Sequence, residues 1–388
     1  MKTDEQIRVI ELLMQRLDDG TNVDAGCLKK NPTDVYRNPE LATREWDSFF
    51  RHHPQVLGLS ADLPEPGSFL TTSDFGVPIL ATRDDAGGLR AFLNVCRHRG
   101  VTLETEERGN CARFTCPFHG WSYANDGSLA GLPNPGQFGV KDRSGLGLIE
   151  LPAAECGGLL WVHPDANGEL DAPMLLGGLE EEFNAWNFSA FRSLGTTTYR
   201  HRMNWKLGID TFGETYHFKM LHRDSLALDF YGDVQTYDKF GRNHRMGLCK
   251  RSIDELRHEP REQWHIVRAA LPVYYLFPNV QVNCLGPGVA LVRLFPEPGD
   301  PARSIARVSF YLHPEAEMMD VDFRGEFEQR FGAVIRDEDF VMASRQQSGA
   351  DSGAQEYVIF GRNEPALHHY HDTYRAALGM PPLENFEG

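Results

Sequence analysis

The 388-residue chain lacks the features of several protein classes. No apolar run approaches the roughly 20 residues of a membrane-spanning helix, and neither internal repeats nor low-complexity segments occur. Basic residues are in deficit, with 39 Lys and Arg against 55 Asp and Glu, so the net charge of -16 argues against nucleic acid or an anionic membrane as a general partner. Five of the seven cysteines, Cys27, Cys111, Cys156, Cys249 and Cys284, are scattered without a pairing pattern, which indicates a reducing compartment. We therefore expect a soluble, cytoplasmic protein.

The most informative segment of the chain is residues 94–123, which hold two short Cys/His motifs. Cys96 and His98 form the first, and Cys116 and His119 form the second after seventeen intervening residues. A single zinc site usually groups Cys with Cys and His with His along the chain. Here each motif carries one Cys and one His, which suits a Rieske [2Fe-2S] cluster with two thiolates on one iron and two imidazoles on the other. We favour the cluster over a zinc-stapled loop.

The residues around these ligands carry a family resemblance. CRHRG in the first motif and CPFHGW in the second resemble the Rieske domain of the Rieske non-haem iron oxygenases. The resemblance implies the catalytic (alpha) subunit of an aromatic-ring-hydroxylating dioxygenase or a related enzyme. It also implies an all-β Rieske domain inserted into a helix-grip catalytic domain, an α+β fold.

A second motif follows about eighty residues later. Asn204-Trp205-Lys206 opens a segment that contains His217 and His222, and two histidines with one carboxylate form the facial triad of non-haem Fe(II) oxygenases. On a regular helix these two imidazoles would point roughly 140° apart, so the helix should end or bulge before His222. In the resemblance this is the mononuclear iron motif.

The carboxylates of this site are assigned by the resemblance. Glu214 lies at the position of the family's bridging acid, which hydrogen-bonds a Rieske histidine of a neighbouring subunit and an iron ligand of its own. For the third iron ligand we choose Asp339, because Asp339, Gln347 and Gly349 match the family's acid-Gln-Gly spacing. Asp337 and Glu338 are its neighbouring competitors. Asp210, where many relatives have a different acid-amide pair, has no assigned role.

Two further groups of residues remain outside these motifs. His368, His369 and His371 look like a metal cluster, but helix periodicity explains their spacing better. Phe212, Phe218 and Leu226 are guesses for the lining of a substrate pocket.

The pattern of apolar, Gly and Pro residues along the sequence predicts three parts. Residues 1–45 are N-terminal helices that pack with the catalytic domain, residues 46–165 are the Rieske domain with short strands and turns, and residues 166–388 are the mononuclear iron domain. Helices are predicted over 4–18, 39–50, 204–222, 321–347 and 364–378, the last capped by Asn363. Long strands are predicted over 196–206, 273–285, 289–297 and 303–314. Consecutive strands with interspersed helices favour an antiparallel sheet and an α+β domain.

The resemblance implies a terminal oxygenase that uses O2 to hydroxylate a small organic substrate, in the first place an aromatic one. Electrons come from NAD(P)H through a separate reductase, with or without a ferredoxin, because no Gly-x-Gly-x-x-Gly motif follows a predicted strand here. Oxidative N- or O-demethylation of a quaternary ammonium or methoxy compound is the alternative within the family. A Rieske electron carrier and a zinc-stabilised binding module are the alternatives outside it. A homotrimer is expected, and a small beta subunit is compatible with the family.

Overall fold

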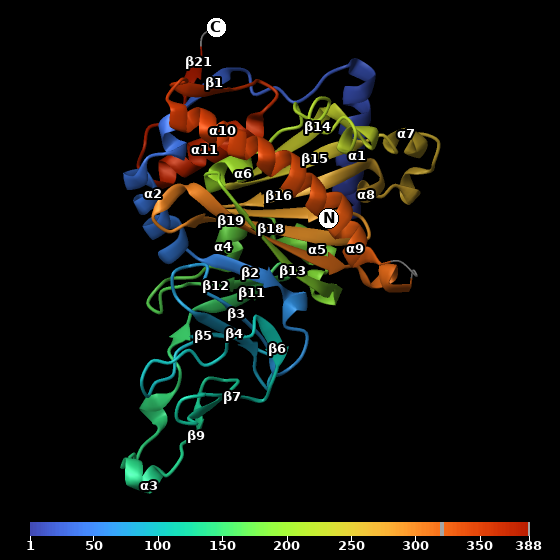
Figure 1. The fold of residues 1–388 in the computed structure, drawn as a ribbon. Helices are drawn as coiled ribbons and strands as arrows, with labels where there is room; N and C mark the ends of the chain where they lie inside the picture. The colour runs from blue at the N-terminus through green and yellow to red at the C-terminus, as the bar shows by residue number, and fades with distance from the viewer. Residues whose placement is uncertain (319–321, 387–388) are drawn as a thin grey trace. The chain divides into compact units, whose positions relative to one another are not determined.

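The computed structural model describes residues 1–318 and 322–386. Its chain forms two compact units (Figure 1). One comprises residues 1–46, 174–186 and 191–388, and the other comprises residues 47–173 and 187–190, so the smaller unit is inserted into the sequence of the larger. The sequence analysis predicted domain boundaries at 45/46 and 165/166. The assignment of a Rieske domain and a mononuclear iron domain to these ranges is still a prediction.

A seven-stranded sheet is the framework of the larger unit, in the order β13-β19-β18-β17-β16-β15-β14 (Figure 1). All of its neighbouring strands pair antiparallel. Three further strands form a small sheet in the order β20-β1-β21, which joins the two ends of the chain. The strands are β1 (Leu28–Pro32), β13 (Arg192–His201), β14 (Phe230–Phe240), β15 (Asn243–Lys250), β16 (Ala270–Leu276), β17 (Val280–Cys284), β18 (Gly288–Glu297), β19 (Asp300–Leu312), β20 (Tyr357–Phe360) and β21 (Glu384–Phe386).

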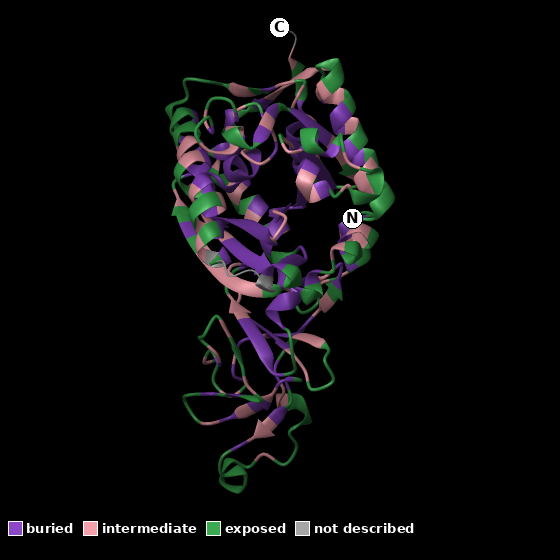
Figure 2. Ribbon diagram, turned by 90° about the vertical axis from the view of Figure 1, so that its right-hand side faces the viewer, coloured by how far each residue is buried: buried purple, intermediate pink, exposed green. Residues whose placement is uncertain are grey.

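The central strands of this sheet are covered on both faces. Strands β16 and β17 are buried at every position, and β18 at every position but its last. Burial on both faces agrees with the predominantly apolar sequences of β16 and β18, whereas β17 alternates Val280 and Val282 with the buried polar residues Gln281 and Asn283. Helix α1 contacts β14 and helix α8 contacts β16, whereas α6 contacts both β18 and β19. In Figure 2 strands inside the larger unit are purple, which marks buried residues, whereas many helical residues are green or pink.

The helices of the larger unit agree only partly with the predictions. The predicted helix over 4–18 is confirmed, but residues 204–222 form one short helix followed by turns, and residues 322–347 are interrupted by two π-helical segments. Residue 321 lies outside the described part. The helices are α1 (Thr3–Asp19), α2 (Pro39–Glu45), α4 (Ala172–Leu176), α5 (Glu180–Trp186), α6 (Trp205–Asp210), α7 (Ile253–Leu256), α8 (Ile266–Ala269), α9 (Phe323–Phe327), α10 (Phe340–Ser352) and α11 (Pro365–Ala377).

The predicted helix over 39–50 is confirmed, and its second half belongs to a π-helical segment (Trp46–Arg51) that follows α2 directly. Two other predicted boundaries are wrong. Glu364, not Asn363, precedes the first turn of α11. The strand predicted over 273–285 is two strands, β16 and β17, and the turn between them contains Pro278, which has no N–H to give to a sheet. Of the helices that the structure describes, none combines the length and apolar content that a bilayer crossing requires.

The smaller unit consists of short antiparallel strands in three sheets. Their orders are β10-β5-β4-β3-β6, β11-β12-β2 and β7-β8-β9. The elements are β2 (Gln55–Leu59), β3 (Ser68–Thr72), β4 (Ile79–Arg83), β5 (Leu89–Leu93), β6 (Arg108–Asn110), β7 (Arg113–Thr115), β8 (Ser122–Ala124), β9 (Leu129–Gly131), α3 (Pro135–Phe138), β10 (Glu150–Leu151), β11 (Ala153–Cys156) and β12 (Leu159–Val162).

A buried ion pair fixes helix α6 within the larger unit. The Lys206 ammonium lies 2.6 Å from Oε1 of Glu45, and both side chains are almost wholly buried. The Trp205 indole N–H donates to the other oxygen of Glu45 at 2.8 Å, and the Tyr374 hydroxyl also donates to this carboxylate. One carboxylate therefore connects α2, α6 and α11. Burial lowers the pKa of Lys206, and the charge of Glu45 opposes that shift.

Replacing Glu45 by Gln should destabilise the larger unit strongly. The substitution keeps the shape but leaves the buried Lys206 ammonium without a counter-charge, which costs about 3–5 kcal/mol in comparable pairs. Urea unfolding followed by tryptophan fluorescence measures the change. Asp233→Asn, at the exposed Lys219–Asp233 pair, is the control and should lose less than about 1 kcal/mol. Equal unfolding midpoints for Glu45→Gln and wild type would contradict this role for the pair.

Candidate metal centres

The first metal centre begins where strand β13 passes into helix α6. Asn204 caps the helix, because its side-chain oxygen accepts the backbone N–H of Lys206 at 3.0 Å. Its side-chain amide donates to the carbonyl oxygens of Tyr36, at 3.2 Å, and Pro301, at 2.8 Å. The Asn-Trp-Lys motif thus fixes the start of α6 with all three of its side chains.

Gln347 connects this helix start to α10. Its side-chain oxygen accepts the backbone N–H of Asn204 at 2.8 Å, and its amide donates to the Tyr36 carbonyl at 3.2 Å and to Asp351 at 2.8 Å. Gln347 is fully buried. The two segments that carry the candidate ligands are therefore joined by direct hydrogen bonds.

Asp210, the last residue of α6, anchors the other end of the helix. Its carboxylate accepts one hydrogen bond from the Tyr36 hydroxyl and one from Nε2–H of His371, each at 2.8 Å. The Asn31 amide lies 3.2 Å from Nδ1 of His371, so it donates there and leaves the ring proton on Nε2. Both ring nitrogens of the buried His371 are thus used in hydrogen bonds within the core. His368 and His369 contact the carbonyl oxygens of Phe360 and Gly241 respectively.

After α6 the chain turns back on itself and carries both candidate histidines. Residues 211–225 are a succession of turns, so the expectation that the helix ends before His222 is confirmed. Gly213 permits this path, because a Cβ atom there would overlap the side chain of Leu367 on α11. The turns bring Nε2 of His217 and Nε2 of His222 to 3.0 Å from each other.

Asp339 completes this group from the opposite segment. It ends the π-helical segment Ile335–Asp339, immediately before α10, and π-helical turns are frequent at functional sites. One of its oxygens, Oδ1, lies 3.5 Å from Nε2 of His217 and 3.2 Å from Nε2 of His222, yet is hydrogen-bonded to neither. Among the described residues, His217, His222 and Asp339 form the only group of three or more His, Cys, Asp or Glu side chains whose possible ligand atoms all lie within 4.8 Å of one another.

The electrostatics of the group favour a bound cation. Burial lowers the pKa of His217, but the carboxylates of Asp339 and Glu214 outweigh it and raise that pKa to about 10. Burial likewise opposes the charge of Asp339, yet the two histidines hold its pKa below the ordinary value. The site thus stabilises positive charge between its ligand atoms. A divalent metal ion satisfies the same atoms, including the unpaired oxygen of Asp339.

Two outer carboxylates orient the two histidines. Nδ1–H of His217 donates to Glu214, which also accepts the backbone N–H of His217 at 3.2 Å. Nδ1–H of His222 donates to Glu338 at 2.8 Å, and Glu338 also accepts the Ser225 hydroxyl at 2.9 Å. When the rings are neutral, each Nε2 therefore has its lone pair free for a metal. The sequence named Glu338 only as a competitor of Asp339 and missed this role, whereas Asp337 pairs with Arg336.

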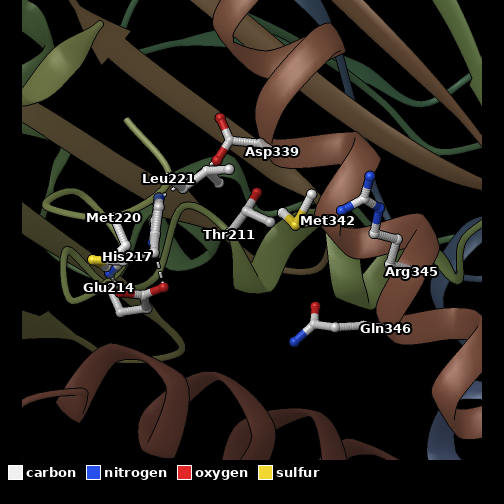
Figure 3. Close-up of a pocket in the computed structure, with 9 residues that line it drawn as sticks. All are labelled: Thr211, Glu214, His217, Met220, Leu221, Asp339, Met342, Arg345 and Gln346. Carbon is white, nitrogen blue, oxygen red and sulfur yellow. Dashed lines mark hydrogen bonds and ion pairs between the residues drawn. The ribbon is translucent and has the colours of Figure 1, made fainter. Parts of the chain in front are cut away.

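An open cavity of about 700 Å³ adjoins these ligands (Figure 3). His217 and Asp339 line it together with Glu214, whereas the guessed residues Phe212, Phe218 and Leu226 are not in the lining. Phe218 and Leu226 instead belong to a separate apolar cluster with Phe230. The lining residues are Thr211, Glu214, His217, Met220, Leu221, Asp339, Met342, Arg345 and Gln346.

The second centre lies in the smaller unit, where two loops repeat one backbone pattern. In the first loop the N–H of Gly100 donates to the Cys96 carbonyl at 3.0 Å, and in the second the N–H of Gly120 donates to the Cys116 carbonyl at 3.0 Å. Both glycines have a positive φ, of 76° and 73°, which favours glycine. Each loop thereby folds back within four residues of its cysteine and presents a Cys and a His.

The cysteine and histidine side chains of these loops differ in burial. Cys96 and Cys116 are buried, whereas His119 is exposed. The rings of His98 and His119 lie 4.5 Å apart, and Trp121 stacks on His98 at 5.0 Å with an interplanar angle of 9°. Nδ1 of His98 is buried and has no hydrogen-bond partner among the described residues.

The four side chains fit a two-iron cluster better than one zinc ion. Thiolates on one tetrahedral zinc lie about 3.8 Å apart, given the usual Zn–S bond length. In the described structure no three ligand atoms of Cys96, His98, Cys116 and His119 lie within 4.8 Å of one another. The Tyr123 hydroxyl accepts a hydrogen bond from the N–H of Arg97 at 3.0 Å and lies 3.4 Å from the Cys96 sulfur, so it can donate its own proton to that sulfur when the sulfur is a thiolate. Burial raises the pKa of Tyr123, which keeps this donor protonated.

Both candidate centres lie within ranges of the chain that match known family models. Residues 53–150 match the model of the Rieske [2Fe-2S] domain, and residues 188–380 match that of the ring hydroxylating alpha subunit, catalytic domain. The chain is an alpha subunit of the Rieske non-haem iron oxygenases. The α+β fold, the Rieske cluster and the mononuclear iron are therefore properties of this oxygenase, and electrons in this family come from a reductase.

Individual relatives differ in the substrates that their names give. The oxygenase is 25% identical over 371 residues to the glycine betaine monooxygenase oxygenase subunit of Chromohalobacter salexigens, with 85% of this chain and 81% of that one covered. It is 29% identical over 253 residues to the anthranilate 1,2-dioxygenase large subunit of Burkholderia cepacia, with 62% and 54% covered. Its fold resembles that of the quaternary ammonium Rieske monooxygenase CntA in complex with L-carnitine, with a TM-score of 0.75, 19% identity, and 90% and 96% covered.

Glu338→Gln should weaken Fe(II) binding while Asp337→Asn should not. The amide introduced at position 338 would lack the charge that holds the Nδ1 proton of His222, and comparable outer carboxylates change metal affinity about 10–100-fold. Iron retained against a graded chelator, normalised to the Rieske absorption, gives the measurement. Iron loss in Asp337→Asn with full retention in Glu338→Gln would reverse the roles that the contacts assign.

Proposed function

We propose that this oxygenase oxidises an N-methyl group of a small quaternary ammonium compound. The observation that carries the proposal is the open cavity that adjoins His217 and Asp339. In the overall reaction O2, two electrons and two protons convert the N-methyl group to N-hydroxymethyl and water. The hydroxymethyl compound then releases formaldehyde and a proton and leaves the tertiary amine. The electrons originate from NAD(P)H bound to a separate reductase, and a cytoplasmic location belongs to the same proposal.

The lining of the cavity supports a cationic substrate. Glu214 contributes a carboxylate beside the metal ligands, and Met220, Leu221 and Met342 contribute apolar surface. A methylated ammonium group has both an apolar surface and a positive charge, so it fits such a wall. The glycine betaine and CntA relatives act, by their names, on this class of compound.

Hydroxylation of an aromatic ring is the second candidate. It is supported by the similarity to the anthranilate 1,2-dioxygenase large subunit, which spans 253 residues. The apolar part of the lining would accept a ring as well. The expectation of an aromatic substrate thus remains a proposal, now second in order.

We propose roles for the site residues as follows. Cys96, His98, Cys116 and His119 hold the cluster, and His217, His222 and Asp339 hold the mononuclear iron. When bound, the two groups supply electron transfer and oxygen activation. The chain itself supplies the rest. Tyr123 donates a hydrogen bond to the sulfur of the ligand Cys96, Glu214 and Glu338 orient the histidines, and the cavity holds the substrate.

Product analysis tests this function. With a surrogate reductase, NADH and a panel of quaternary ammonium compounds, wild type should release formaldehyde in proportion to the NADH consumed. Asp339→Ala should lose mononuclear iron and product while keeping the Rieske absorption, whereas Cys116→Ser should lose that absorption. Hydroxylated products from an aromatic panel alone would favour the second candidate. Loss of iron in Asp337→Ala with retention in Asp339→Ala would show that the third ligand is misassigned.

We also propose a homotrimeric ring in which Glu214 links the cluster of one subunit to the iron of the next. Exposed apolar side chains on each unit support such contacts. Phe118, 54% exposed, and Phe138, 48% exposed, surround the cluster histidines, whereas Tyr216 and Met220, 75% and 78% exposed, flank His217. Two different surfaces of this kind form a heterologous contact, which closes into a ring.

Glu214→Gln should therefore slow turnover without removing either cofactor. The amide keeps the size of the side chain but cannot hold two imidazole protons by charge, so we expect turnover to fall about 10–100-fold, as for other outer carboxylates. Cluster reduction, iron content and sedimentation are measured beside turnover, with Glu181→Gln on the surface as the control. A monomer with full activity, or unchanged turnover in Glu214→Gln, would count against the link between subunits.

A further inference from the structure

The wall of the cavity opposite His217 is built by helix α10. Arg345 and Gln346 project from this helix across the cavity from Glu214 and His217 (Figure 3). Arg345 follows the metal-side residue Asp339 by six positions, which corresponds to a rise of about 9 Å along a helix. The cavity therefore has a metal end, with His217 and Asp339, and an arginine end, with Arg345.

The two ends differ in charge. At the metal end Glu214 binds His217, and Asp339 lies between both histidines. At the other end no acidic group of the described residues forms an ion pair with Arg345, although acidic residues outnumber basic ones in the chain by 55 to 39. Arg345 is also the one Lys or Arg among the lining residues that the structure describes. Its guanidinium is therefore available to a ligand.

We propose that this cavity binds a substrate that carries a carboxylate, and that Arg345 holds that carboxylate at the end remote from the metal. The proposal rests on the proposed function only in taking the cavity as the place of oxidation. A planar carboxylate matches the guanidinium fork with two parallel N–H···O bonds. The side-chain amide of Gln346, the next residue on α10, can donate a further hydrogen bond.

Within the quaternary ammonium class, this selects compounds with both charges. The ammonium end of a betaine would lie toward Glu214 and the metal ligands, and the carboxylate toward Arg345. The arrangement places an N-methyl group, rather than the carboxylate, beside the metal. Arg345 is thus a specificity-determining residue that sets which end of the substrate reaches the metal ligands.

Two matched pairs of probes test this inference: glycine betaine with choline, and anthranilate with aniline. Isothermal titration calorimetry on the anaerobic holoenzyme gives each Kd for wild type, Arg345→Met, Arg345→Lys and Arg303→Met. Arg303 is an exposed arginine beside Asp300, so its substitution removes the same charge elsewhere. The Rieske absorption and the iron content confirm that each variant is folded and loaded.

Wild type should bind the carboxylate member of at least one pair more tightly than its partner. Arg345→Met should weaken that member about 10–100-fold, the usual effect of a charge-assisted hydrogen bond, and leave the partner unchanged. Arg345→Lys should retain part of the preference, and Arg303→Met all of it. No preference in either pair, or a preference that survives Arg345→Met, would overturn the inference.

The same probes separate the inference from the proposed function. A preference confined to anthranilate, with no formaldehyde from glycine betaine or choline, would refute the quaternary ammonium substrate and leave the role of Arg345 intact. Formaldehyde release from choline and glycine betaine with equal affinities, unaffected by Arg345→Met, would do the reverse.

Discussion

The proposed iron site depends on one short hydrogen-bonded junction, the contact of 2.8 Å between the backbone N–H of Asn204 and the side chain of Gln347. Asn204 starts the segment that ends in His217 and His222, and Gln347 lies on the helix that follows Asp339. His217 and Asp339 are 122 positions apart in the sequence, so no local preference can bring them together. The junction is buried, and an unpaired polar group there would cost about 1–3 kcal/mol. Loss of either side chain would therefore loosen both halves of the site together.

Local patterns predicted the parts of the site, and long-range contacts decided how the parts are used. The Cys/His loops could be read from the sequence, since each ligand pair lies within four residues. The end of the helix before His222 also followed from helix geometry, because two rings five positions apart cannot share a face. The true length of that helix could not be read, because the path of the chain after Asp210 brings Gly213 against Leu367 of α11, a residue from a distant segment. The roles of Glu338 and of the Asp210–His371 pair were hidden for the same reason, since each partner comes from a distant segment.

The same residue types serve two purposes in this molecule. His371 and Asp210 form a pair much like His222 and Glu338, with an imidazole N–H donated to a carboxylate at 2.8 Å. In His371 the second ring nitrogen is taken by the Asn31 amide, so the ring is satisfied and has no lone pair left for a metal. In His222 the second nitrogen faces His217 and Asp339. The partner of the second nitrogen therefore distinguishes a core histidine from a ligand.

Charge at the proposed iron site bears on the orientation of the substrate. A bound Fe(II) brings two positive charges, but Asp339, Glu214 and Glu338 surround the two histidines with three carboxylates. With neutral imidazoles the assembled site thus remains formally negative, and an anionic group would be repelled from it. Arg345 provides the one fixed positive charge among the described lining residues, at the other end of the cavity. Repulsion at one end and attraction at the other act in the same direction, so a zwitterion would be oriented before any contact with the metal is made. Such orientation is useful because oxidation of one carbon requires that carbon, and not its neighbour, to lie next to the metal.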